Sequence, residues 1–176
     1  MMSKFFLLLL FFASGCISKE IRKPLNKSSD YFLKQSAQRN RLLLAAEQNL
    51  MNDVINADTK KQYISSKKGF WYYHKNKKTS SSLTPTKGDL VEFTYSIATL
   101  NGEMLYDRET LGRVSYQVDE EDILPALREG VKLMKVGEVV VFLFPSYLCY
   151  SYQGDGEKIG INQPLQFEIS LDTIIK

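Results

Sequence analysis

The sequence is poor in the side chains on which most enzyme chemistry depends. Its 176 residues contain two cysteines, Cys16 and Cys149, and one histidine, His74. No metal-ligand spacing, catalytic triad, phosphate-binding loop or dinucleotide fingerprint is present. We interpret Cys149 as a small core residue, because the sequence identifies no base that would activate its thiol. The sequence therefore predicts no metal and no cofactor.

A long hydrophobic run is also absent. The apolar run from Phe5 to Ala13 has nine residues, whereas a helix needs about 20 to cross a bilayer. Because the run follows Lys4, it is typical of the core of a secretory signal peptide. It ends in Ala13-Ser14-Gly15-Cys16, which resembles the lipobox of bacterial lipoproteins.

This resemblance implies a lipoprotein signal peptide over residues 1–15 and a lipidated Cys16 as the first mature residue. More than one acyl chain holds a protein on a membrane far better than a single chain does. With Cys16 lipidated, Cys149 has no partner for an intramolecular disulfide. We therefore expect a lipoprotein that faces the periplasm from the outer membrane. The alternative is a soluble exported protein in which Cys16 is an ordinary residue.

Acidic residues are scarce in the first half of the chain and abundant in the second. Residues 17–90 contain 15 Lys and Arg against 6 Asp and Glu, and residues 91–176 contain 7 against 14. The basic half either favours an anionic membrane surface or forms a solvated face, since its charges are scattered. A nucleic-acid partner is disfavoured, because no basic run interleaves with aromatic residues.

Glycine and proline are missing from Asp30 to Ala57, and this stretch predicts a helix. Residues 16–29 before it have the composition of a tether, and a second helix-favouring run extends the helical segment to about residue 68. Ser29 or Asp30 would cap the helix. Its apolar stripe comprises Leu33, Ala37, Leu44, Met51, Val54 and Ile55. The stripe would cover the protein's own domain, a second copy in a homodimer, or another component of a complex.

Residues 69–176 have the pattern of strands around one short helix. Gly69 to Tyr73 is dense in aromatics, and the stretches 91–97 and 165–171 alternate apolar and polar residues. Val139 to Phe144 is continuously apolar, as in a central strand. The helix would follow the acidic residues 119–122, hold Pro125 in its first turn, and point Ile123, Leu127, Val131 and Met134 inward. This pattern predicts an α+β fold with an antiparallel sheet, preceded by an N-terminal helix.

Five segments then occur in one order: KGDLVEFTY, NG, EEDILPALREGVKLMKVGE, FPSYLCY and IGINQPLQFEISL. Together they resemble the FKBP-type peptidyl-prolyl cis-trans isomerases over residues 69–176. The resemblance implies an antiparallel sheet wrapped around one short helix, and an aromatic-lined pocket that binds proline-containing polypeptides without a cofactor.

Three residues take the catalytic positions of that family. Tyr95 lines the pocket, Leu124 supplies a backbone amide, and Tyr150 supplies a hydroxyl over the pocket mouth. The resemblance implies a substrate-binding wall and floor made of Leu105, Tyr106, Asp107, Val114, Tyr116, Ile123, Leu127, Ile159 and Phe167.

Three positions depart from the usual family pattern. Leu127 replaces the common floor Trp, Tyr106 replaces an Asp that here follows as Asp107, and Ser151 replaces a Gly. They leave a second hypothesis open, a non-catalytic FKBP-fold chaperone or assembly factor tethered to the membrane.

The lipobox and the segments GFWYY, DLVEFTY, LREGVKLMKVGE, FLFPS and IGINQPL most resemble the FKBP-type lipoproteins associated with gliding motility in Bacteroidetes. That resemblance implies a role in folding or assembling components of a motility and secretion apparatus. It extends to the N-terminal helix, which would then contact the apparatus or a second copy.

Overall fold

A computed structural model describes residues 27–78 and 83–176. The predicted signal peptide, Cys16 and most of the predicted tether lie outside the described residues. The chain divides into two compact units, Met1–Ser36 and Ala37–Lys176. The described part of the first unit is helical. The second unit contains the whole sheet together with the remainder of that helix.

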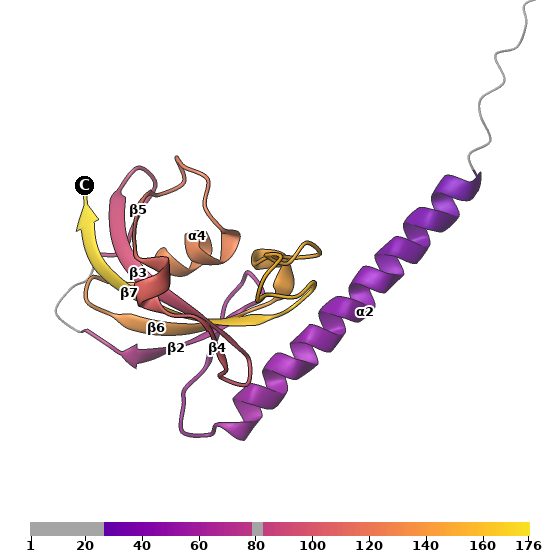
Figure 1. The fold of residues 1–176 in the computed structure, drawn as a ribbon, viewed down its shortest axis with the longest axis horizontal. Coiled ribbons are helices and arrows are strands. Elements are labelled where there is room, and N and C mark those ends of the chain that lie inside the picture. Colours follow the sequence, from indigo (N-terminus) through magenta and orange to yellow (C-terminus); the bar gives the residue numbers. More distant parts are fainter. Residues whose placement is uncertain (1–26, 79–82) are drawn as a thin grey trace, which may run out of the picture. The chain divides into compact units, whose positions relative to one another are not determined.

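Seven strands form one sheet, in the order β1-β2-β6-β7-β3-β4, with β5 also paired to β3. All of these pairings are antiparallel. The strands are β1 Ile64–Ser65, β2 Trp71–Asn76, β3 Leu90–Thr99, β4 Met104–Tyr106, β5 Arg113–Gln117, β6 Val139–Phe144 and β7 Leu165–Ile175. Helix α4, Pro125–Val131, lies against one face of the sheet (Figure 1). The short helices α3, Arg108–Leu111, and η1, Ser146–Leu148, follow β4 and β6. The predicted α+β fold with an antiparallel sheet is confirmed.

The strand patterns explain which face of the sheet is buried. In β7 the residues alternate between buried and half-buried, so that Phe167, Ile169 and Leu171 point to one face. Strand β6 is buried on both faces from Val140 to Phe144. Its continuous apolar run therefore reflects its central position between β2 and β7, as the sequence predicts.

Helix α4 packs directly against this face at Gly130, which has no side chain. A Cβ at Gly130 would lie 3.3 Å from Cδ1 of Ile169 and 3.4 Å from Cζ of both Phe142 and Phe144. Pro125 opens the helix, as expected. The helix also follows the acidic residues 119–122, as predicted. These residues form the preceding turn, and the first turn of α4 has no acidic residue.

Helix α2, Lys27–Ala57, begins within the predicted tether, because Lys27, Ser28 and Ser29 are already helical. Residues 58–68 do not continue it, since they form turns and β1. The predicted stripe is only partly correct. Met51 is buried and Val54 and Ile55 are half-buried, but Leu33, Ala37 and Leu44 are exposed. The residue that the stripe omitted is Glu47, whose side chain is buried.

We find no helix in residues 27–78 or 83–176 with the length and apolar character needed to span a membrane.

Candidate functional site

Aromatic side chains from three strands lie on the face of the sheet against which helix α4 packs. The Phe142 and Phe144 rings stack with centroids 5.2 Å apart, and Phe144 meets Phe167 edge to face at 5.5 Å. Phe167 in turn stacks against Tyr95 at 5.9 Å, with only 14° between the ring planes. Aromatic pairs favour these offset and edge-on arrangements. The Phe142, Phe144 and Phe167 rings are fully buried, and the Tyr95 ring beside them is half-buried.

Nearly all of the predicted site residues belong to the buried hydrophobic core of the domain or pack against it. Four of them are buried members of this hydrophobic core: Tyr116, Leu127, Ile159 and Phe167. Seven others are half-buried and pack against the core: Tyr95, Leu105, Tyr106, Val114, Ile123, Leu124 and Tyr150. We call these eleven residues the aromatic cluster. Phe93, which the sequence analysis did not select, is fully buried beside Tyr95, with the two ring centroids 6.1 Å apart.

Asp107 lies outside the aromatic cluster. Its side chain is exposed and caps α3 by accepting a hydrogen bond from the Thr110 amide at 2.7 Å. The hydrogen bond from that amide lowers the pKa of Asp107. Its structural role here is therefore that of a helix cap.

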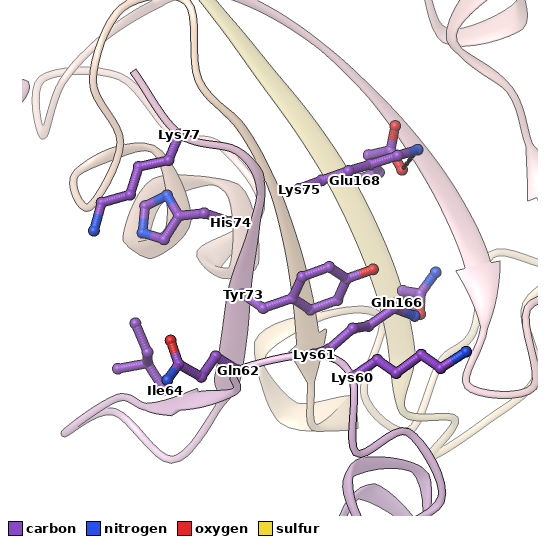
Figure 2. A pocket seen from close by; sticks show the side chains of 10 residues that line it. All are labelled: Lys60, Lys61, Gln62, Ile64, Tyr73, His74, Lys75, Lys77, Gln166 and Glu168. Carbon is purple, nitrogen blue, oxygen red and sulfur yellow. Dashed lines mark hydrogen bonds and ion pairs between the residues drawn. The ribbon is translucent and has the colours of Figure 1, made fainter. Parts of the chain in front are cut away.

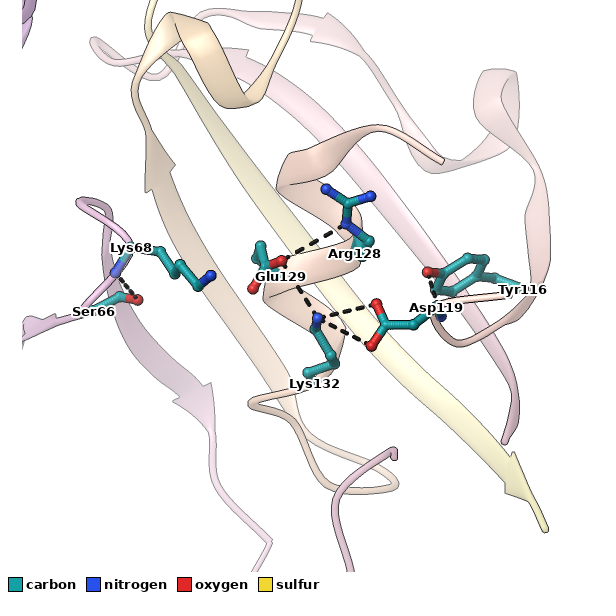
Figure 3. Close-up of polar contacts among 7 residues, drawn as sticks. All are labelled: Ser66, Lys68, Tyr116, Asp119, Arg128, Glu129 and Lys132. Carbon is teal, nitrogen blue, oxygen red and sulfur yellow. Dashed lines mark hydrogen bonds and ion pairs between the residues drawn. The ribbon is translucent and has the colours of Figure 1, made fainter. Parts of the chain in front are cut away.

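The entrance to α4 is held by polar contacts around Asp119, a non-glycine residue with a φ of 57°. The amide of Asp119 donates to the Tyr116 hydroxyl at 2.9 Å, and its carboxylate pairs with Lys132 at 3.1 Å (Figure 3). Lys132 also pairs with Glu129 at 3.4 Å. These contacts tie the turn before α4 to the helix itself, which fixes the position of Ile123 and Leu124 between them.

A polar network that the sequence analysis missed lies at the rim of the cluster. The Tyr106 hydroxyl donates to the carboxylate of Asp155. The same carboxylate accepts from the amides of Glu157 at 2.9 Å and Ile159 at 2.8 Å. Lys158 covers the Tyr106 ring, with its Nζ 4.8 Å from the ring centroid. Tyr106, which departs from the family pattern, is thereby fixed against the loop that carries Ile159.

This network shifts the pKa of both partners. Desolvation opposes ionisation of Asp155, but the hydrogen bonds from Tyr106 and from the amides outweigh it and lower the pKa of Asp155 to about 2. The hydrogen bond to Asp155 raises the pKa of Tyr106 to about 12. At neutral pH Asp155 is therefore an anion and Tyr106 a neutral donor.

The two tyrosines predicted to be catalytic remain protonated at neutral pH. Burial raises the pKa of Tyr150 to about 12 and also raises the pKa of Tyr95. Among the described residues, none accepts a hydrogen bond from the Tyr150 hydroxyl. This hydroxyl is therefore a half-buried donor with unused capacity at the edge of an apolar surface.

Cys149 is buried and forms no disulfide. Burial raises the pKa of its thiol, with a further contribution from the charge of Glu47. A buried thiol with a raised pKa is a poor nucleophile, which confirms its interpretation as a core residue. Across the described ranges, no three His, Cys, Asp or Glu side chains gather as a set that could hold a metal ion.

Open cavities are found away from the aromatic cluster. One of about 730 Å³ lies on the opposite face of the sheet (Figure 2), as the side chains of Tyr73, Lys75 and Glu168 show. Lys60, Lys61 and Lys77 make its lining basic. Another, of about 300 Å³, lies between helix α2 and the segment after β6. At the aromatic cluster, the Tyr95 and Phe167 rings are nearly parallel, with their centroids 5.9 Å apart.

The sequence profile of the FKBP-type peptidyl-prolyl cis-trans isomerases matches residues 81–172, which contain β3 to α4, β6 and most of β7. The chain belongs to this family. The matched range includes every residue of the aromatic cluster and excludes helix α2.

Relatives and solved structures agree with this assignment. The chain is 33% identical over 99 residues to the probable FKBP-type peptidyl-prolyl cis-trans isomerase FkpA of Neisseria meningitidis serogroup B, an alignment that covers 56% of this chain and 36% of that protein. The chain thus matches only about a third of this relative's length.

Two crystal structures share the fold. One is a peptidyl-prolyl cis-trans isomerase from Pseudomonas syringae pv. tomato, with a TM-score of 0.61, 20% identity, and coverage of 77% of this chain and 96% of that chain. The other is FkpA from Escherichia coli, with a TM-score of 0.60, 22% identity, and coverage of 84% and 68%. At these identities the likeness establishes the fold alone.

We predict that Asp155→Asn weakens the acid sensitivity of the fold. Because the pKa of Asp155 is lowered to about 2, its ionisation stabilises the folded state above the unfolded-state pKa of about 4. That contribution is lost as the pH falls from about 4 to about 2. Urea unfolding of the full chain at several pH values should show a smaller loss of stability in this window for Asp155→Asn than for the parent. Glu157→Gln, an exposed neighbour, is the control. Parallel curves for parent and Asp155→Asn would contradict the prediction.

Proposed function

We propose that this chain is a peptidyl-prolyl cis-trans isomerase that acts on proline-containing polypeptides. The observation that supports the proposal is that Tyr95, Ile123, Leu124 and Tyr150 pack, half-buried, against the apolar core that contains Phe167, in a chain of the FKBP family. An apolar surface suits a proline ring, which is compact and apolar.

The reaction requires no bond to be made or broken. Rotation about an Xaa-Pro amide has a barrier of about 18–20 kcal/mol, because the twisted state loses conjugation. A site that binds the twisted amide better than the planar one lowers this barrier. A water-poor surface does so because the twisted amide is less polarised than the planar amide. The aromatic cluster offers this environment without an acid or a base.

Two donors are available to hold the substrate's carbonyl groups. The Tyr150 hydroxyl is one. The other is the backbone amide of Leu124, the residue immediately before α4, which has no acceptor among the described residues. Both flank the apolar surface, so a bound polypeptide would be held by its backbone while its proline ring contacts Phe167 and its neighbours.

A second candidate is a chaperone or assembly factor without turnover. The observation that favours it is that Leu127, at the position of the usual floor Trp, is only 2% exposed and closed over by its neighbours. Such a protein would grip apolar segments at the surface and suppress the aggregation of clients that contain no proline.

We further propose that the chain acts in the periplasm as an outer-membrane lipoprotein anchored through Cys16. The apolar run followed by Ala13-Ser14-Gly15-Cys16 supports this location. Its clients would be exported proteins, in which spontaneous proline isomerisation takes tens of seconds or more. The resemblance to lipoproteins of gliding motility supports the components of a motility and secretion apparatus as those clients.

We predict that the full chain accelerates isomerisation of Xaa-Pro peptides and that Tyr150→Phe slows it. Losing one hydrogen bond to the substrate costs about 0.5–1.5 kcal/mol, which corresponds to a decrease of about 2- to 10-fold in kcat/KM. Tyr152→Phe is the matched control, because Tyr152 is 72% exposed. Absence of turnover in the parent, together with protection of proline-free clients, would favour the chaperone instead.

We also predict that Cys16→Ser releases the protein from membranes. Cells that express the parent and are fed an alkyne fatty acid should yield a labelled protein in the membrane fraction. Cys16→Ser should lose both the label and the membrane association, because it removes the acylated thiol. Cys149→Ser should keep both, since Cys149 is buried in the fold. A labelled Cys16→Ser variant would refute the anchor.

A further inference from the structure

Helix α2 contributes one buried charge to the second compact unit. Glu47 is only 3% exposed. One of its carboxylate oxygens accepts from the Ser146 amide at 2.7 Å and the other accepts from the Ser146 hydroxyl at 2.6 Å. Among the described residues, no lysine or arginine pairs with Glu47. A buried carboxylate is costly unless it is well hydrogen-bonded, so this contact with Ser146 is specific and strong.

Ser146 is in turn the residue on which the following segment closes. Its carbonyl accepts from the amides of both Cys149 and Ser151, each at 2.9 Å. The turn between these amides contains Tyr150. Ser151 has a φ of 52°, an uncommon conformation for a residue with a side chain, and its carbonyl accepts from the Asn162 amide at 2.6 Å. The conformation on both sides of Tyr150 is therefore set by Ser146.

These contacts form one chain from the helix to the aromatic cluster. Glu47 accepts hydrogen bonds from the amide and the hydroxyl of Ser146, at the start of residues 146–151. The Ser146 carbonyl accepts from the amides of Cys149 and Ser151. Tyr150 lies between these two residues and packs against the hydrophobic core. Glu47 itself is remote from the site in sequence, since it is separated from Ser146 by 99 positions. The family profile begins at residue 81, so Glu47 lies outside the part of the chain that defines the family.

We propose that Glu47 is a positioning residue, which holds residues 146–151 in the conformation that presents the Tyr150 hydroxyl to the substrate. The helix is then a working part of the isomerase site and not only a spacer between anchor and domain. This inference rests on the proposed isomerase function. It predicts that an isomerase cut to residues 69–176 has a loosened Tyr150 segment and reduced turnover.

The test uses the full chain with Glu47→Gln, which keeps the shape and removes the charge. Asp53→Asn is the matched control, because it removes one charge from an exposed position on the same helix. We expect Glu47→Gln to lower kcat/KM for an Xaa-Pro peptide by about 3- to 10-fold and Asp53→Asn to leave it unchanged. Both variants are checked for intact folding by circular dichroism.

A double-mutant cycle separates positioning from general destabilisation. If Glu47 acts through Tyr150, Glu47→Gln has little further effect in a Tyr150→Phe background. The same loss in both backgrounds would overturn the proposal.

A second readout does not depend on turnover. Hydrogen exchange followed by mass spectrometry should show faster exchange over residues 146–151 in Glu47→Gln, but not in Asp53→Asn. Unchanged exchange would overturn the proposed positioning even in an active enzyme. If Glu47→Gln speeds exchange but the parent chain shows no isomerase activity, the positioning of residues 146–151 by Glu47 is supported and the proposed isomerase function is wrong.

Discussion

The close approach of helix α4 to the aromatic face of the sheet is the contact on which the rest of the site depends. Gly130 allows it, because any Cβ there would press against Ile169, Phe142 and Phe144. With the helix at this depth, Leu127 and Val131 are buried, and Leu124 comes to the edge of the aromatic surface. A helix held farther out would leave voids that cores do not tolerate and would remove the Leu124 amide from the substrate's path.

The groups around this surface are charged or neutral in ways that suit binding without proton transfer. The pKa values of Tyr150 and Tyr106 are raised to about 12, and that of Asp155 is lowered to about 2. None of these groups changes its charge near neutral pH. Asp155 instead anchors Tyr106 and the loop before Ile159, and so stabilises one wall of the site.

The parts of this structure that follow from local pattern could be predicted from the sequence. Alternation in β3 and β7 and the apolar run of β6 reflect burial on one face or on two, and Pro125 marks the start of α4. Two contacts could not be predicted. Asp155 and Tyr106 are 49 positions apart and meet only through the fold. Glu47 interrupts the apolar stripe of its helix, and a charged residue on a buried face has no signature in a pattern based on hydrophobicity.

The pH dependence of catalysis by the full chain, measured with an Xaa-Pro peptide in light and heavy water, tests the proposed mechanism most directly. If the apolar surface works by favouring the twisted amide, kcat/KM is constant from about pH 5 to pH 9 and the solvent isotope effect is about 1. A rate that rises or falls with a pKa in this range, or a solvent isotope effect of about 2 or more, would show that a proton moves in the rate-limiting step. Such a result would contradict a mechanism without proton transfer.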